Sequence, residues 1–407
     1  MFKASTGIGY GSDEYTVAVS ATSSAMSKLE SENINLIPKL VIVFTSVKYN
    51  AELVQKGIRS IAGSEAKIIG CSTAGEITEE GTAKQQSIAV MLIASDNVQF
   101  TTAVSEDLTK DSELAGGELS GQLKAGTEPD LEKLILMFID GLRGNGSATL
   151  RGVNNKLNNA IPVVGGTAGD DDEFKQTYQY HQGSVYTDSV VGVLMSGNLK
   201  IGIGVKHGWT AVGLPGLVTE ADGSIIRTID NKEAIDFYTK YLGEDEVKNL
   251  RKQTLGQLAL SYPLGFKDAD TGEMLLRAPF SVGSDGSITC GGEIPEGSYV
   301  QIMVGDREDI IKAAKEATLT AVTSYQGEQP EACLIFNCHV RKNFFGSKAD
   351  TESEMDTVKS VLGKKIPTLG FYTYSEIAPI RKTMNNESEL FPQFHNETIV
   401  VLLLGEN

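Results

Sequence analysis

The sequence predicts an α/β fold with mixed sheets, made of three repeated strand-helix-strand units and a β-rich subdomain inserted in the C-terminal half. Three observations support this prediction. Continuous Val/Ile/Leu runs mark strands buried on both faces, glycine-rich loops recur in the same order behind them, and the helical stretches between strands are long enough for parallel crossovers. With 407 residues, 41% of them hydrophobic, the chain is long enough for two or three domains.

The three repeated units share the order strand, helix, strand, glycine-rich turn, strand. Their first strands are KLVIVF (39–44), KLILMF (133–138) and ACLIFNC (332–338), and their turns lie in KIIGCSTAGEI (67–77), PVVGGTAGDDDEF (162–174) and PTLGFYTYSEIAP (367–379). The spacing between the Phe of the first strand and the first glycine of the turn is 26, 27 and 34 residues, counted from Phe44 to Gly70, Phe138 to Gly165 and Phe336 to Gly370. The third unit therefore has a longer connection within the same plan. The apolar strand behind each turn is expected to extend the sheet in the antiparallel direction.

A stretch of different character, from about 217 to 305, separates the second unit from the third. It begins with an amphipathic helix around Phe237, continues with turn-rich strands around LLRAPFSV and YVQIMV, and leads into a second helix, DREDIIKAAKEATLTAVTSY. We interpret it as an inserted β-rich subdomain whose boundary lies in LPGLVT (214–219). The expected domains are 1–216, with two repeats, and 217–407, with the inserted subdomain and the third repeat.

Charge and composition exclude several classes of function. The formal net charge is −17 and no Lys/Arg-rich run occurs, which disfavours nucleic-acid binding and binding to membrane surfaces. The N-terminus has no apolar signal-peptide core, and apolar runs such as 88–94 are far too short to span a membrane. Four cysteines without a C-x-x-C pair indicate reduced thiols rather than a disulfide framework or a zinc site. We therefore expect a cytoplasmic protein.

The three turns share the skeleton G-x-x-T-x-x-E/D, with the second copy one residue shorter before its Thr. Open α/β sheets bind ligands at the carboxyl ends of parallel strands, and glycine lets a ligand approach the backbone there. A tight turn with a capping Thr and an acidic residue at the start of a helix is the structural alternative. The third copy favours a binding role, because it places Phe371, Tyr372, Tyr374 and Glu376 in one short turn, where aromatic rings beside a carboxylate suit a cationic group.

The segment FNCHVRKNFF (336–345) ends the first strand of the third unit, so its side chains are expected beside the third turn. Arg341 could hold a carboxylate or phosphate in a bidentate manner, and Glu376 could hold an amine. The alternative is a purely structural pair between Arg341 and Glu376. Arg277, in LLRAPF, is a second candidate anion ligand with a weaker claim, since an edge strand often exposes an Arg. The expected ligand-binding residues are Arg277, Cys338, Arg341, Tyr372, Thr373, Tyr374 and Glu376.

GCSTAGEI, GGTAGDD, FNCHVR, GFYTYSEIAP and the terminal FHNETIVVL resemble the signature segments of the FIST family, in the order that this family uses them. The stretches VTEADGSIIRTIDNKEAIDFYTKYLG and GSITCGGEIPEGSYVQIMVGDREDIIKAAKEA resemble its C-terminal domain. The resemblance covers nearly the whole chain and implies a signal-input module of mostly bacterial signalling systems, with amino acids as the proposed ligands. Ser375 departs from the glycine common at its position in the family, which narrows the ligand cleft or adds a hydroxyl contact.

The resemblance also implies an alternative ligand, because some stand-alone FIST members are associated with haem and nitric oxide sensing. His395, in FPQFHNET, is the best-placed axial ligand, with His181 and His207 as weaker candidates. No C-x-x-C-H segment occurs, so a bound haem b would be non-covalent. The preferred hypothesis is a zwitterionic ligand without a cofactor. The Arg, Glu and Tyr side chains of the third unit suit the opposite charges of a zwitterion better than they suit a haem.

A catalytic role is the third hypothesis and the least favoured. GCSTAG misses the G-x-S-x-G spacing of a nucleophile elbow, and neither a P-loop nor H-E-x-x-H occurs. Cys71, Cys338 and His339 could form a thiol-imidazole pair in a thiol-dependent enzyme, but nearby cysteines are usually buried small hydrophobes. We expect a sensor rather than an enzyme. Since no effector domain is recognisable, the output is expected to pass to a separate protein, such as a histidine kinase or a cyclic-nucleotide enzyme; the oligomeric state is left open.

Overall fold

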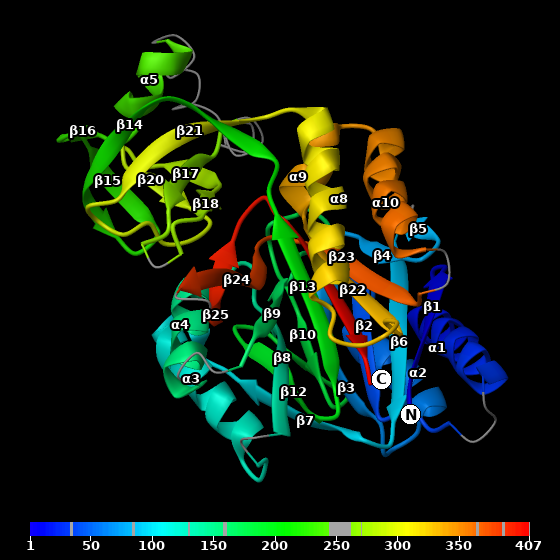
Figure 1. The fold of residues 1–407 in the computed structure, drawn as a ribbon. Helices are drawn as coiled ribbons and strands as arrows, with labels where there is room; N and C mark the ends of the chain where they lie inside the picture. Colours follow the sequence, from blue (N-terminus) through cyan, green and yellow to red (C-terminus); the bar gives the residue numbers. More distant parts are fainter. Residues whose placement is uncertain are drawn as a thin grey trace.

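Three sheets with the same strand order form the body of the protein (Figure 1), in a computed structural model that describes residues 1–32, 36–83, 86–128, 131–157, 161–243, 262–269, 271–363, 366–384 and 387–406. The first sheet runs β1 (Phe2–Tyr10), β6 (Ser87–Ser95), β2 (Leu40–Ser46), β3 (Lys67–Thr73). The second runs β7 (Val98–Ser105), β12 (Val190–Gly197), β8 (Glu132–Ile139), β9 (Val163–Thr167). The third runs β13 (Lys200–Lys206), β26 (Ile399–Gly405), β22 (Ala332–Cys338), β23 (Thr368–Thr373).

The pairing within these sheets is the same in all three. The last two strands of each order are parallel, and the other neighbouring strands are antiparallel. The α/β fold with mixed sheets and three repeated units is therefore confirmed. Each unit begins one strand and one helix earlier than the sequence pattern indicated, at β1, β7 and β13, because these strands alternate with exposed positions and lack a continuous apolar run.

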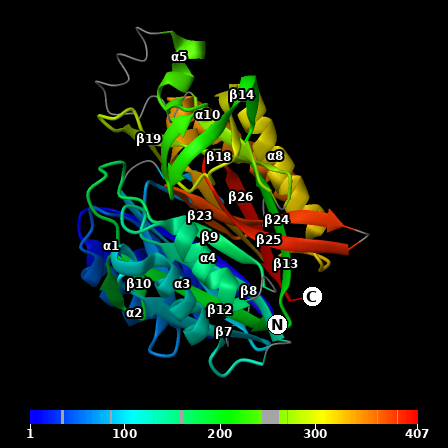
Figure 2. The same cartoon turned by 90° about the vertical axis from the view of Figure 1, so that its left-hand side faces the viewer.

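Helices cover the outer face of each sheet, and the inner faces share one apolar core. The first sheet carries α1 (Glu14–Glu32) and α2 (Ala51–Ala62), the second α3 (Leu108–Lys124) and α4 (Gly146–Leu157), and the third α8 (Arg307–Ser324), α9 (His339–Phe345) and α10 (Lys348–Leu362). Figure 2 shows α3 and α4 in front of the second sheet. Each helix layer packs in its own apolar cluster, separate from the cluster between the three sheets.

The three equivalent phenylalanines of the first parallel strands meet in the central core. The ring centroids of Phe44 and Phe138 lie 5.2 Å apart, and those of Phe138 and Phe336 lie 6.2 Å apart. Phe371 fills the remaining space, 4.4 Å from Phe44 and 5.6 Å from Phe336. The spacing that reveals the repeat in the sequence thus reflects one packing position used three times.

The first glycine of each turn is required by a close approach of two parallel strands. Gly70, Gly165 and Gly370 pair in register with Val43, Met137 and Ile335. A Cβ on these glycines would lie 1.8, 1.9 and 2.3 Å from the partner's carbonyl oxygen, which is far inside van der Waals contact. The glycines are therefore fixed by backbone packing, without any ligand.

Each unit lends a hairpin to the sheet of another unit. β4 (Glu76–Thr78) and β5 (Gly81–Thr82) of the first unit extend the third sheet at β23. β10 (Gln179–His181) and β11 (Ser184–Tyr186) of the second unit extend the first sheet at β3. β24 (Glu376–Met384) and β25 (Glu387–His395) of the third unit extend the second sheet at β9. The exchange closes a cycle among the three units (Figure 1).

The inserted subdomain lies between β13 and α8, at the upper left of Figure 1. It consists of β14 (Trp209–Asp222), β15 (Ile225–Ile229), β16 (Lys232–Glu233), α5 (Asp236–Leu242), β17 (Leu264–Lys267), β18 (Met274–Arg277), β19 (Pro279–Val282), β20 (Ile288–Cys290) and β21 (Tyr299–Gly305). Phe237 and Tyr238 of α5 are buried in its core, as the amphipathic pattern indicated. The expected division between 216 and 217 falls within β14, and β13 of the third unit precedes it.

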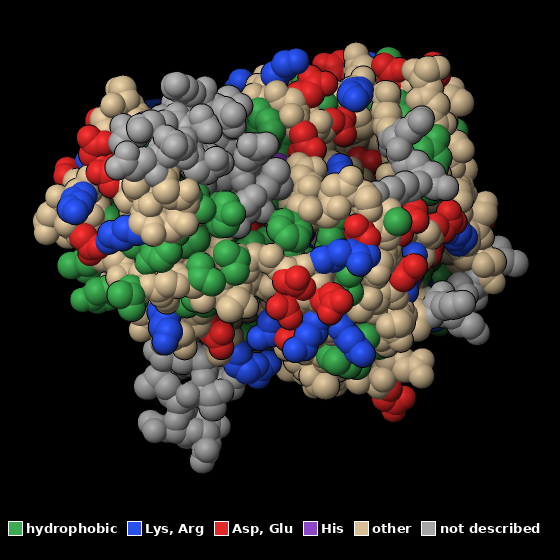
Figure 3. Space-filling view, turned by 90° about the horizontal axis from the view of Figure 1, so that it is seen from above, with side chains coloured by type: hydrophobic (Ala, Val, Ile, Leu, Met, Phe, Trp, Pro, Cys, Tyr) green, Lys and Arg blue, Asp and Glu red, His purple; other side chains and the backbone are tan. Residues whose placement is uncertain are grey.

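Two further observations concern the helices and one face of the surface. No helix in the described ranges has the length and hydropathy needed to cross a bilayer. On the face seen from above, the described Lys and Arg side chains stand among Asp and Glu side chains rather than forming a continuous basic surface (Figure 3).

Candidate functional site

The three G-x-x-T-x-x-E/D turns meet at the carboxyl ends of the parallel strands and hydrogen-bond to one another. The N–H of Gly169 donates to the carbonyl of Ser72 at 3.0 Å, and the N–H of Thr167 donates to the carbonyl of Ser375 at 2.8 Å. The N–H of Tyr372 donates to the carbonyl of Gly75 at 2.8 Å. The turns therefore form one connected layer above the central core.

The acidic residue of each turn is buried and serves the turn itself. Glu76 accepts hydrogen bonds from the hydroxyls of Thr73 and Ser87, and its burial raises its pKa to about 7. Asp170 accepts from the backbone N–H groups of Phe174, Lys175 and Gln176 and from the hydroxyl of Tyr374. Both residues thus have a structural role in their turns, but neither starts a helix as the structural alternative expected, since Glu76 begins the strand β4.

Glu376, the acid of the third turn, is fully buried and lines none of the cavities described below. One carboxylate oxygen accepts from the N–H and the hydroxyl of Thr398, at 3.0 and 2.8 Å. The other, Oε1, is buried without a hydrogen-bond partner. Burial raises the pKa of Glu376 to about 8. Thr373 of the same turn is buried and bonds to the backbone of Ser375.

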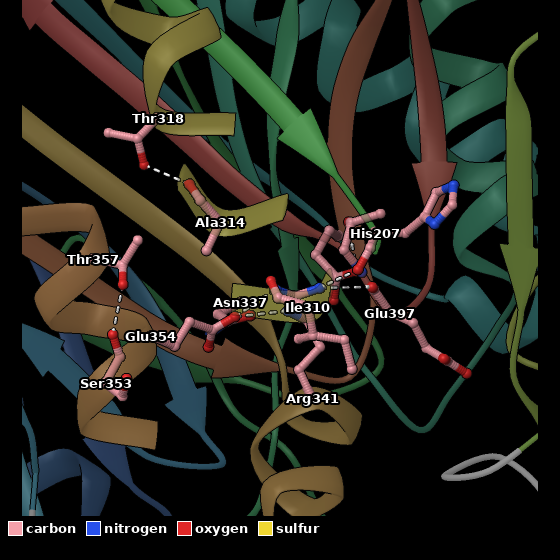
Figure 4. A network of polar contacts seen from close by, with 12 residues as sticks. His207, Ile310, Ala314, Thr318, Asn337, Arg341, Ser353, Glu354, Thr357 and Glu397 are labelled. Carbon is pink, nitrogen blue, oxygen red and sulfur yellow. Dashed lines mark hydrogen bonds and ion pairs between the residues drawn. The ribbon is translucent and has the colours of Figure 1, made fainter. Parts of the chain in front are cut away.

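Arg341 lies in a buried polar network (Figure 4). Its guanidinium forms an ion pair with Glu354, and the side chains of both residues are 0% exposed. It also donates to the backbone carbonyls of His207, Ile310 and Glu397. All three guanidinium nitrogens are engaged, so Arg341 has a structural partner, which is Glu354 rather than Glu376. Its neighbour in sequence Cys338 is also buried, and desolvation raises the pKa of the thiol.

Arg277 is buried as well, and it joins the inserted subdomain to the body. Its Nε donates to the carbonyl of Glu293 at 2.8 Å, and its Nη1 donates to the carbonyls of Leu276 and Phe394 at 2.8 and 3.1 Å. Burial lowers its pKa to about 10. The expected single pocket is thus not formed: Tyr372 and Tyr374 line two different cavities, while Arg277, Arg341 and Glu376 lie in the packed interior.

The surroundings of His395 do not fit a haem. The ring is buried, its Nε2 lies 3.0 Å from the carbonyl oxygen of Ala378, and burial lowers its pKa to about 4. The cavity that it lines together with His207 has a volume of about 230 Å³. Pockets for ligands of drug size have volumes of about 300 Å³ or more. An iron ligand at this position would require the Ala378 contact to break and the cavity to widen.

The cavity that we call the subdomain cavity has a volume of about 650 Å³ and lies between the second unit, the third turn and the inserted subdomain. Its walls are Asp140, Gly141, Leu142, Arg143, Gly144, Asn145, Gly146, Thr167 and Phe174 of the second unit, Tyr374, Ser375 and Phe394 of the third, and Ser224, Phe280, Thr289, Cys290, Gly291 and Gly292 of the inserted subdomain. Of these, Arg143 is exposed, and it is the one cation. Asp140, the one acid, is buried and accepts from Leu142, Arg143, Thr177 and Asp188.

Three features of the subdomain cavity suit an anionic group. α4 begins at this wall, and Asn145 caps it by accepting from the N–H of Ala148 at 3.0 Å. The first N–H groups of a helix have no partner within the helix and carry partial positive charge. At Gly144, which is exposed and needs its φ of +71° for the turn, a ligand can approach the backbone, whereas the rings of Tyr374 and Phe394 pack against Gly141 and Gly146. Arg143 adds a full positive charge at the rim.

Thr167 offers a free hydroxyl at this cavity. Its oxygen is buried and has no hydrogen-bond partner within the part of the chain that the structure describes. The equivalent hydroxyls are both used locally, because Thr73 donates to Glu76 at 2.6 Å and Thr373 donates to the backbone of Ser375. A buried hydroxyl is usually hydrogen-bonded, so the hydroxyl of Thr167 is available as a donor to a group bound in this cavity.

Aromatic rings line the subdomain cavity beside this turn. Phe174 stacks on Tyr374 with ring centroids 4.9 Å apart and an interplanar angle of 12°, although Phe174 remains 55% exposed. Phe280 and Phe394 contribute two further rings. Sequence reasoning identified Tyr374 and Ser375 of this cavity but missed Arg143 and Phe174. The segment GLRGNG (141–146) could have indicated this site. It lies at the end of the first strand of the second unit, as FNCHVR does in the third unit.

Protein-family comparison matches a FIST N domain model to residues 39–232 and a FIST C domain model to residues 234–379. The chain belongs to the FIST family. FIST domains are associated with the sensing of small ligands in signal transduction. In this chain the subdomain cavity lies between the two FIST domains, because its second-unit wall is in FIST N and Phe280 to Gly292 are in FIST C.

An uncharacterized protein of Methanocaldococcus jannaschii is 26% identical to this FIST protein over 338 residues, which cover 76% of the chain and 64% of the relative. Among solved structures, cyanuric acid hydrolase from A. caulinodans aligns over 100% of both chains at 8% identity and a TM-score of 0.39. T. maritima PurL complexed with AMPPCP aligns over 99% of this chain and 72% of its own, at 10% identity and a TM-score of 0.24.

Proposed function

We propose that this chain is a cytoplasmic sensor that binds an amino acid or a similar small zwitterion in the subdomain cavity and signals to a separate effector. The observation that carries the proposal is a cavity of about 650 Å³ whose opposite walls belong to the body and to the inserted subdomain. A ligand there touches both parts at once. All four cysteines are free and buried, which is consistent with a reducing compartment.

The charged ends of a zwitterion have suitable partners on two walls. The carboxylate would lie at the N-terminus of α4, within reach of Arg143 and the unpaired hydroxyl of Thr167. The ammonium group would lie against the outer face of Phe174, the exposed ring of the stacked pair with Tyr374, where a cation is attracted by the ring quadrupole. The remaining aromatic surface suits an apolar side chain.

Binding would stabilise the contact between the inserted subdomain and the second unit. That contact is polar: Glu293 accepts from Asn145 at 2.9 Å and from Arg151 at 2.6 Å, and its N–H donates to Ser147 at 3.3 Å. Polar contacts of this kind are weak enough for a ligand to shift the balance between a loose and a tight arrangement. The effector would then read the position of the inserted subdomain; a histidine kinase or a cyclic-nucleotide enzyme is the proposed class.

A binding role is preferred to catalysis because no candidate nucleophile is poised. Cys71 and Cys338 are fully buried, and desolvation raises the pKa of both thiols, which keeps them protonated. His339, the imidazole proposed as a base, bonds through Nδ1 to Asp172 at 2.9 Å.

Calorimetric titration with single amino acids, guided by mass spectrometry of small molecules that co-purify, tests the proposal. We expect one amino acid to bind, and Arg143→Ala to weaken binding about tenfold, the effect of about 1.4 kcal/mol. Arg307→Ala is the matched control, because Arg307 is an exposed arginine on α8 that pairs with Asp350 outside the cavity. A Soret band after reconstitution with hemin that is lost in His395→Ala, with no amino acid binding, would overturn the proposal.

A further inference from the structure

A second cavity, which we call the lysine cavity, lies between the first and third units and has a volume of about 500 Å³. It is lined by Lys48, Ala74, Gly75, Thr82, Ala83, Gln86 and Asp171 and by Lys342, Asn343, Gly346, Ser347, Thr351 and Tyr372. None of the roles derived above for the subdomain cavity involves these side chains.

The lysine cavity and the subdomain cavity occupy equivalent places in the threefold repeat. In the subdomain cavity, the connection behind β8 and the start of α4 face the turn that leads into β24. In the lysine cavity, the connection behind β22 and the start of α10 face the turn that leads into β4. Ser347 caps α10 by accepting from the N–H of Asp350, as Asn145 caps α4. The fold therefore builds the same kind of cavity at two of its unit boundaries.

The chemistry of the two cavities differs. Aromatic rings dominate one wall of the subdomain cavity, whereas the lysine cavity is lined by two ammonium groups and by the hydroxyls of Thr82, Ser347 and Thr351. Tyr372 contributes the one aromatic ring among its lining residues. Two cationic side chains converge here although the chain carries a formal net charge of −17. Like charges brought together in a hollow favour an anion between them.

The two lysines come from different units and are held to different degrees. Lys342 is fixed, because its Nζ donates to the carbonyl of Ala74 at 2.7 Å and lies 5.4 Å from the centroid of the Tyr372 ring. Lys48 is exposed, and no ion pair of its ammonium group is found among the described residues. The one acid of the lining, Asp171, accepts from the hydroxyl of Ser46 at 2.5 Å. Burial raises the pKa of Asp171 and the charges of Lys48 and Lys342 oppose that rise, so Asp171 neutralises the two lysines in part.

We propose that the lysine cavity is a second ligand site, which binds a small molecule through a carboxylate or phosphate group held between Lys48 and Lys342. The two ammonium groups neutralise the oxyanion, and the hydroxyls of Ser347 and Thr351 lie on the wall where the positive end of α10 adds to the attraction. Lys48 is the side chain that moves to contact the ligand, because the ammonium group of Lys342 is already held by the carbonyl of Ala74.

The test is calorimetric titration of the full chain with inorganic phosphate and with succinate, at constant ionic strength. We expect saturable binding of at least one anion, weakened about tenfold to a hundredfold in Lys48→Ala and in Lys342→Ala. Preference for phosphate or for succinate identifies the natural oxyanion. Lys56→Ala, on the exposed face of α2, is the matched control and should bind as the wild type does.

Two results would overturn the proposal: no saturable binding of either anion, or binding that survives Lys48→Ala unchanged. Thermal melting of each variant without ligand shows whether Lys342→Ala, which loses its contact to Ala74, still folds; the exposed Lys48 keeps the test decisive in either case. Failure here is separable from failure of the proposed amino acid site, because Arg143→Ala should leave anion binding at the lysine cavity intact.

Discussion

Arg341 of α9 and Glu354 in the middle of α10 form a buried ion pair between the two helices that follow β22 (Figure 4). The pair joins α9 to α10, and the remaining guanidinium N–H groups tie it to the segments that carry His207, Ile310 and Glu397. A charge buried in this way is stable only while its partners are present, because removing one leaves the other desolvated and unpaired. The side chain of Arg341 thus stabilises the fold of the third unit.

We predict that Arg341→Ala lowers the free energy of unfolding by about 3 to 5 kcal/mol, the usual cost of leaving a buried charge unpaired. Arg341→Lys should not restore it, since an ammonium group cannot reach several acceptors in the fixed geometry of a guanidinium. Urea denaturation measures both effects. The double variant Arg341→Met, Glu354→Leu should lose less than Arg341→Ala; an Arg341→Ala protein as stable as wild type would contradict this account.

Glu376 makes stability depend on pH. Its pKa is raised in the folded state to about 8, from an ordinary value of 4.5, so the folded protein binds more protons than the unfolded chain between these values. Stability contributed by this carboxyl is therefore present below pH 4.5 and is lost as pH rises towards 8. We predict that Glu376→Gln gains stability relative to wild type as pH increases from 5 to 8, measured by thermal melting across that range. Glu30→Gln, at an exposed position of α1, should show no such trend.

At the scale of elements, the parallel strand pairs are the most constrained part of the fold. Each pair β2–β3, β8–β9 and β22–β23 brings a carbonyl against a glycine of its neighbour. The turn behind the glycine is then held by hydrogen bonds to the other two turns. A change at this point affects the layer on which both cavities depend.

We predict that Gly70→Ala and Gly370→Ala each destabilise the protein by about 1 to 3 kcal/mol or more, because the added Cβ meets backbone atoms that cannot turn aside. Gly121→Ala, in α3, has no atom within 4 Å of the added Cβ and should stabilise by about 0.5 to 1 kcal/mol. Urea denaturation of the three variants decides the matter. Equal effects at all three positions would show that the close approach is not the cause.

The sequence carried the repeat clearly, because Phe44, Phe138 and Phe336 occupy one packing position and the glycines behind them meet one steric requirement. The hairpin exchange was not predictable, since β4 and β10 have only three residues each and periodicity says nothing about a strand's partner. Arg341 was expected to hold a ligand; its partner Glu354 lies on the next helix, a tertiary contact that spacing does not reveal. The glycines of GLRGNG indicate a turn. The binding site was nevertheless predicted at the third turn, because that turn contains several aromatic residues.

At the scale of the molecule, the body and the inserted subdomain meet through an apolar cluster around Trp209, through buried Arg277 and through a polar contact at the second unit. Glu293 is central, because it pairs with Asn145 and with Arg151 across the boundary. Arg151 also pairs with Glu113, which lies in the second unit itself. The same arginine therefore offers one contact across the boundary and one within the body.

We predict that Glu293→Ala loosens the inserted subdomain without unfolding the body. Amide hydrogen exchange should quicken in β20 and at the start of α4, and affinity at the subdomain cavity should fall, while the melting temperature changes little because the ion pair is half-exposed. Glu113→Ala is the matched control and should leave both exchange and affinity unchanged. Identical exchange in the two variants would argue against a movable subdomain.

The exchange of hairpins also delays strand pairing during synthesis of the chain. β4 leaves the ribosome long before its partner β23, and at about 5 to 20 residues per second the interval between Thr78 and Leu369 is roughly 15 to 60 seconds. For part of that time β9 also lacks its pairing partner β24. Nascent chains of this protein therefore display open strand edges until the third unit emerges, which makes them substrates for holding chaperones and sensitive to any pause in translation.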